Sequence, residues 1–261
     1  MRILAAIILV STVSSGVFAQ ATGTSAKPKL QKAALAPAKK PPITRTVETQ
    51  LSGFTSQDAD QLYARLALQE TRAQRSWYVR GAISRTVTKN GSTSSVITSK
   101  LDSRLEHSAG AKSYSVWTGV LSGRDRDYST KRNDQRSGYE FLSYGYGRQL
   151  GAKAKGDIGL GVLKVWDDET STRPSVVFSV RGRHPLNKSL TFESDTLLIQ
   201  PLDALRSTKI DSDLALAHEL APGLSLRLGW SLNNLIRSIH NNREWDSIVR
   251  LSISYRRTST K

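Results

Sequence analysis

Apolar and polar positions alternate along the last third of the chain, over residues 190–256. Most of the large apolar residues there occupy every second position, and Asp, Glu, Arg and Ser fill most of the positions between them. This period gives a β-strand one apolar face and one polar face. Four such segments, which begin near Leu190, Ile210, Leu224 and Trp245, follow one another without a helical pattern between them. They predict an up-and-down meander of antiparallel strands.

Six further segments with the same period lie between Ser76 and Arg183, so the sequence predicts about ten strands. Connections after the even-numbered strands are short, and those after the odd-numbered strands are longer and more polar, as at 123–136. The first odd-numbered connection is the exception, because Asn90-Gly91 predicts a tight turn there. Short turns at one end, longer loops at the other and strands of about 10 residues are typical of outer-membrane barrels.

A soluble β-sandwich is the alternative, since its strands alternate too. Its strands are usually shorter, with a mode of about 5–6 residues, and its loops have no reason to alternate in length. We therefore expect an all-β fold, an antiparallel up-and-down barrel of about ten strands over residues 76–257. Its strands would cross the outer membrane of a Gram-negative cell envelope as transmembrane β-strands.

The first residues predict export. Arg2 and the apolar run that follows it, up to the small residue Ala19, are typical of a secretory signal peptide over residues 1–19. Residues 20–46 are rich in Ala, Lys and Pro and contain few large apolar groups. Such a segment buries too little apolar surface to offset the entropy cost of ordering, so we expect a disordered basic linker.

One helix is expected before the barrel, in a helical segment over residues 47–75. Ser56 can cap a helix over 56–75, with acidic residues in its first turn and arginines in its last turn. An apolar stripe along it would pack on the barrel, plug it or contact a partner. After the barrel, residues 258–261 form a short C-terminal tail.

Charge leaves more than one partner open. The chain carries a net charge of +16 and no cysteine, so an exported fold would not depend on disulfides. The expected partners are outer-membrane lipid or lipopolysaccharide, and peptidoglycan through the basic linker; nucleic acid is not expected. The alternative is a soluble periplasmic or secreted basic β-protein that binds an anionic glycan or lipid.

Candidate chemistry is sparse, and we expect no catalytic residue, cofactor or metal site. The four histidines have no metal-ligand spacing. Ser231 and His240 are a possible nucleophile and base for an envelope-lipid hydrolase, but serine is abundant and chance explains the pairing. The acidic cluster 167–169 could bind a cation, although an exposed solvated turn explains it more simply.

The polar faces of the strands are more informative. If the apolar faces contact lipid, the charged residues between them point into the barrel. In a narrow barrel these charges form a satisfied network more readily than an open pore, so a narrow pore is a secondary expectation. The candidate lumen-facing charged residues are Arg80, Lys100, Asp102, Arg104, Asp195, Asp211, Asp213, Arg227, Asp246 and Arg250. The candidate aromatic girdle is Trp77, Trp230, Trp245 and Tyr255.

The segments 190–195, 211–216, 224–230 and 246–255 resemble those of outer-membrane β-barrel families, and the chain is similar to the salt-induced outer membrane protein (YdiY-like) family. The resemblance covers about residues 76–257 and is one of pattern. It implies an outer-membrane barrel inserted by the barrel assembly machinery, and it offers no catalytic residues. Such barrels often end on an aromatic residue, and Arg257 stands at that position here.

Overall fold

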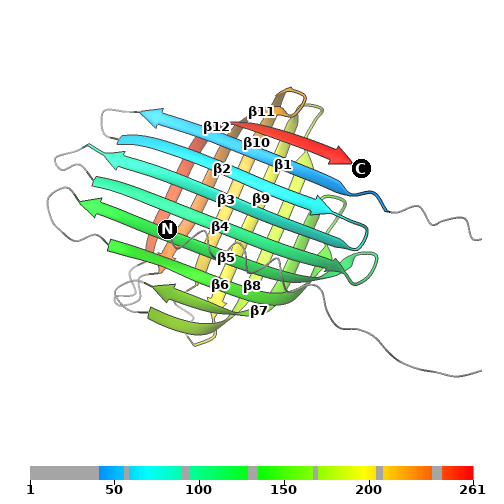
Figure 1. Ribbon diagram of the computed structural model, residues 1–261, viewed down its shortest axis with the longest axis horizontal. Coiled ribbons are helices and arrows are strands. Elements are labelled where there is room, and N and C mark those ends of the chain that lie inside the picture. The colour runs from blue at the N-terminus through cyan, green and yellow to red at the C-terminus, as the bar shows by residue number, and fades with distance from the viewer. Residues whose placement is uncertain are drawn as a thin grey trace, which may run out of the picture. The chain divides into compact units, whose positions relative to one another are not determined.

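Twelve antiparallel strands close into one barrel in the described part of the computed structural model, and the blue β1 pairs with the red β12 to complete the ring (Figure 1). The described residues are 41–55, 59–89, 94–128, 135–166, 170–203, 208–236 and 243–260. The strands are β1 (Thr44–Thr55), β2 (Ala59–Thr71), β3 (Arg75–Thr88), β4 (Ser94–Ser108), β5 (Ser113–Tyr128), β6 (Gln135–Gln149), β7 (Ala154–Trp166), β8 (Thr170–Pro185), β9 (Leu190–Pro201), β10 (Lys209–Ala221), β11 (Leu224–Ile236) and β12 (Arg243–Thr260).

The predicted antiparallel barrel is confirmed, with twelve strands in place of about ten. The two further strands are β1 and β2, and the prediction of a helix over 56–75 is wrong for its described residues. Leu62 and Leu66 fit a helical stripe, but together with Leu68 they also share one parity and are exposed, whereas Tyr63 and Arg65 are partly buried. As a strand, the segment pairs with β1 and β3; as a helix, it would leave sheet edges unpaired.

The strands extend beyond the predicted bounds of the barrel. Residues 44–46, expected at the end of the basic linker, belong to β1, and residues 258–260, expected in a tail, belong to β12. The predicted signal peptide and linker residues 20–40 lie outside the described residues. No helix in the described part of the chain is long and apolar enough to cross a membrane.

The two ends of the barrel differ. Five tight connections lie at one end, here called the short-turn end, together with the first residues of β1 and the last residues of β12. At the β10–β11 turn, Pro222 precedes Gly223, which has a φ of 80°. Glycine adopts this left-handed conformation with little steric strain, because it has no Cβ atom. The opposite end, the loop end, carries the other six connections, four of which are longer than any at the short-turn end, while 56–58 and 167–169 have only three residues. The predicted connection 123–136 is shorter than expected, because β5 and β6 extend over most of it.

Large apolar side chains cover the outer face of the barrel. Among the described residues, eleven of the twelve strands expose at least one of them. They are neighbours across the sheet, as in the row formed by Leu216 on β10, Leu228 on β11 and Leu251 on β12. Leu160, Leu228 and Leu251 are 66%, 50% and 61% exposed. Monomeric soluble proteins rarely expose contiguous apolar patches larger than a few hundred Å².

On β3, exposed charged residues mark the two edges of this apolar belt. On β3 the outward positions between Arg75 and Arg85 are Trp77, Val79, Gly81 and Ile83, none of them charged. Ten residues of strand span about 34 Å, or about 26 Å along the barrel axis at a tilt of about 40°. That height matches the apolar band of about 25 Å that surrounds outer-membrane barrels.

The interior has two halves. Towards the loop end, inward side chains of β5 to β9 form an apolar cluster: Val120, Tyr139, Phe141, Leu163, Val165, Val177, Leu197 and Ile199. Towards the short-turn end, most inward side chains are charged or polar. The barrel is therefore filled on one side and lined by ion pairs on the other.

Candidate functional site

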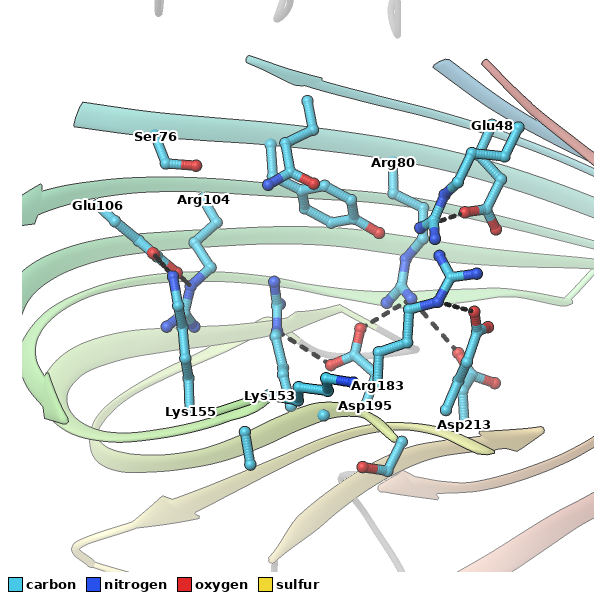
Figure 2. Close-up of a pocket in the computed structure, with 18 of the residues that line it drawn as sticks. Glu48, Ser76, Arg80, Arg104, Glu106, Lys153, Lys155, Arg183, Asp195 and Asp213 are labelled. Carbon is cyan, nitrogen blue, oxygen red and sulfur yellow. Dashed lines mark hydrogen bonds and ion pairs between the residues drawn. The ribbon is translucent and has the colours of Figure 1, made fainter. Parts of the chain in front are cut away.

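Arg80 is the centre of the charged interior. Its guanidinium donates from Nε to Asp102 Oδ2 at 2.6 Å and from Nη1 to Asp195 Oδ2 at 2.9 Å, and it lies 3.7 Å from Asp213 Oδ2. Figure 2 shows Arg80 directed towards Asp195 and Asp213. β3 carries Arg80 and β9 carries Asp195, and these strands are not neighbours in the sheet. The contact therefore crosses the interior of the barrel.

Lys100 and Arg181 extend this ion-pair system on both sides. Lys100 Nζ lies 3.5 Å from Asp102 and also donates directly to Asp211. Arg181 Nε lies 3.1 Å from Asp195 Oδ1. We call these seven residues the central network: Arg80, Lys100, Arg181, Asp102, Asp195, Asp211 and Asp213. Within it, three cations face four carboxylates, so its charges are close to balance.

Arg250 contacts the network through a hydroxyl group. Ser231 Oγ donates to Asp213 at 2.6 Å and accepts from Arg250 Nη1 at 2.8 Å. The Arg250 guanidinium also lies 4.5 Å from the centre of the Tyr63 ring, which is within cation–π distance. Both contacts fix the orientation of a long side chain that points into the barrel.

A second group of charges, the Arg104 cluster, lies nearer the short-turn end. Arg104 donates to Asp157 and, from Nε, to Glu106 Oε1 at 2.7 Å. Lys155 Nζ donates to Glu106 Oε2 at 2.6 Å. Two cations thus neutralise two carboxylates. Tyr114 adds a hydrogen bond from its hydroxyl group to Asp157 at 3.3 Å.

A third group, the Glu48 cluster, joins β1, β2, β8, β9, β11 and β12. Glu48 lies 2.7 Å from Arg256, 3.4 Å from Arg227 and 3.8 Å from Arg65. Glu193 lies 3.0 Å from Arg227 and 3.4 Å from Arg183. The cluster is Glu48, Glu193, Arg65, Arg183, Arg227 and Arg256. Four guanidinium groups share two carboxylates, so positive charge is in excess here.

Nine of the ten candidate lumen-facing residues lie in these interior groups: Arg80, Lys100, Asp102, Arg104, Asp195, Asp211, Asp213, Arg227 and Arg250. The side chain of Asp246 lies outside the described residues. Sequence reasoning missed Arg181, although it lies at inward parity on a predicted strand, and Asp157, which directly precedes the strand predicted over 158–166. It also missed Glu48 and Arg65, because the segment that contains them was expected to be helical.

Two cavities border the central network. The larger, about 350 Å³, is lined by all three groups and by Ala152 and Lys153 of the β6–β7 connection, so it reaches the short-turn end (Figure 2). The smaller, about 110 Å³, contains Tyr63, Lys100 and Arg250 in its lining. Arg80 and Asp213 line both cavities. The network therefore separates the two spaces.

The candidate girdle residues lie on the outer face. Trp77 and Tyr255 are exposed near the short-turn ends of β3 and β12. Trp230 is exposed at the middle of β11, where its Nε1 donates to Ser247 Oγ at 2.8 Å. The Trp245 side chain lies outside the described residues. Sequence reasoning did not include Trp117, which is exposed on β5 with its ring centre 4.9 Å from that of Tyr144.

The described residues contain no group of His, Asp and Glu side chains that could hold a metal ion. His107, His184 and His218 are exposed on three different strands. His240 and the acidic cluster 167–169 lie outside the described residues, so the Ser231–His240 alternative stays untested.

No protein-family model and no curated protein sequence matches the chain. Among solved structures, it is similar to the translocator domain of the autotransporter NalP from Neisseria meningitidis, with 12% identity and a TM-score of 0.44 over 82% of this chain and 87% of that one. It is similar to an outer membrane channel from Pseudomonas putida F1, with 11% identity and a TM-score of 0.43 over 88% and 100% of the chains. It is also similar to the KdgM porin, with 8% identity and a TM-score of 0.40 over 80% and 98%. The resemblance to the salt-induced outer membrane protein family stays a prediction.

Proposed function

We propose that this chain is an outer-membrane β-barrel of a Gram-negative envelope, with a structural or envelope-associated role. The apolar belt is the observation that carries the proposal. It surrounds a closed barrel, its height between Arg75 and Arg85 is about that of the hydrocarbon layer, and its residues are highly exposed. Closure supports the same conclusion, because every strand has two hydrogen-bonded neighbours and no sheet edge would face lipid.

The proposed barrel is closed to large solutes. The apolar cluster occupies the β5–β9 side of the interior towards the loop end, and the central network separates the two cavities. Ion pairs across the barrel hold that partition in place. A narrow path for small ions is the finer alternative; single-channel recording in planar bilayers distinguishes the two, since steady conductance steps would favour the narrow pore.

The proposed role is not enzymatic. Ser231 already bonds to Asp213 and Arg250, so its hydroxyl group belongs to the ion-pair system. Outer-membrane lipid or lipopolysaccharide would cover the apolar belt. The barrel assembly machinery would insert the barrel into the membrane. Peptidoglycan would be met through the basic segment that precedes β1.

The test is heat-modifiability of the protein in the envelope fraction. An unheated sample should migrate differently from a boiled one, because a closed barrel resists detergent until it is heated. A protein recovered entirely in the soluble periplasmic fraction, with no gel shift, would contradict the proposal. That result would favour the alternative, a soluble basic β-protein that binds an anionic glycan or lipid.

A further inference from the structure

Positive charge is unevenly distributed in the interior. Among the described residues, nine Arg or Lys side chains and five Asp or Glu side chains line the larger cavity. The central network and the Arg104 cluster are close to neutral. The surplus therefore belongs to the Glu48 cluster, with its four arginines and two glutamates, and to Lys153 at the mouth of the cavity.

The arginines of this cluster also keep donors free. Nε of Arg65 and Nε of Arg227 have no hydrogen-bond acceptor among the described residues, although both atoms are buried. The Arg227 side chain is 7% exposed and uses its two terminal nitrogens for Glu48 and Glu193. A buried donor without an acceptor is costly, and a guanidinium group is well suited to bind an oxyanion. Independently of the charge surplus, these unsatisfied donors show that the two glutamates do not saturate the arginines of the cluster.

We propose that the Glu48 cluster binds a small multivalent oxyanion that carries phosphate or carboxylate groups. The cavity volume of about 350 Å³ lies within the range of small-molecule sites. Entry is from the short-turn end, because the central network and the apolar cluster lie on the other side. In the proposed outer-membrane barrel that end faces the periplasm, so this assignment of side rests on the proposed function.

The experiment is isothermal titration of the full-length barrel in a neutral, phosphate-free detergent. Inorganic pyrophosphate is the phosphate probe and citrate the carboxylate probe, both at constant ionic strength. We expect saturable binding of at least one probe, and the comparison of the two identifies the preferred group. If neither probe binds saturably, the proposal is overturned.

Arg65→Gln is the test variant. We expect its affinity for the probe to fall at least about tenfold, because one guanidinium group is lost together with its charge and its N–H donors. A tenfold change corresponds to about 1.4 kcal/mol. Arg250→Gln is the matched control, since Arg250 is also an interior arginine with a free Nε but lines the smaller cavity. Equal affinities in the two variants would overturn the assignment.

Glu48→Gln should change the affinity for the probe in the opposite direction. Removal of a competing carboxylate should tighten binding several-fold, whereas a purely structural role for Glu48 would leave the affinity equal or weaker. A gel-shift assay on the same samples separates a failed site from a failed barrel. Absence of binding with an intact gel shift overturns the site alone, and loss of the gel shift in the wild-type protein overturns the proposed function.

Discussion

Removing the Arg80 guanidinium should weaken the barrel strongly. In Arg80→Met the side-chain volume changes little, but Asp102 loses its shortest ion pair, 2.6 Å in length. The side chains of Arg80 and Asp102 are only 7% and 6% exposed, so water cannot replace the lost partner. Loss of one member of a buried ion pair costs about 3–5 kcal/mol. We expect the lower part of that range, because Asp195 and Asp213 reach the cavities and Lys100 still lies 3.5 Å from Asp102.

The assay is equilibrium unfolding of the barrel in urea, followed by tryptophan fluorescence. Arg85→Met is the control, because Arg85 lies on the same strand, is exposed and points outward. Its effect should stay within about 0.5 kcal/mol. The double variant Arg80→Met/Asp102→Leu should recover part of the loss, since it also removes the orphaned carboxylate. A loss below about 0.5 kcal/mol in Arg80→Met would refute the view that the central network holds the barrel together.

Three other perturbations probe different parts of the structure. Leu160→Arg places a charge in the middle of the belt and should destabilise the membrane-inserted barrel by about 2–4 kcal/mol. Leu220→Arg, at the short-turn end, should cost only about 0–1 kcal/mol. Equal urea midpoints for the two variants would contradict the proposal that lipid surrounds the belt. Gly145→Ala should lower the stability of the barrel by about 1–3 kcal/mol, because the added methyl group would lie 2.3 Å from a carbonyl oxygen of β7. In Gly81→Ala the added methyl group meets nothing within 4 Å, so this control should be close to neutral in the same measurement. Ser231→Ala should leave the envelope lipid profile unchanged, and altered lipid composition with an intact barrel would count against a non-enzymatic role.

The closed barrel could be predicted because alternation is a local property of the sequence. The same rule failed at β2, where Ala, Leu, Gln and Arg favour a helix and Leu62 and Leu66 fit both periods. What decided in favour of a strand was not local. Only closure of the sheet requires partners for β3 and β12, and β1 and β2 provide them.

The interior charges were predictable as a set but not as pairs. Parity places Arg80 and Asp195 on inward faces, yet their contact joins β3 to β9 across the barrel. Such contacts depend on the number of strands in the barrel and on the stagger between them. Neither quantity can be predicted from the sequence of a single strand. The excess of arginines at Glu48 was hidden for the same reason, since its members come from six strands.

In the proposed barrel lipid covers the outer face, and the chain's own tryptophans test this. Trp77, Trp117 and Trp230 are exposed on that face. The measurement is their fluorescence after reconstitution into vesicles whose lipids carry brominated acyl chains, which quench only indoles in the hydrocarbon layer. The outer-membrane barrel predicts strong quenching relative to vesicles without bromine. Equal fluorescence in the two preparations, with the protein left in the supernatant after centrifugation, would contradict it.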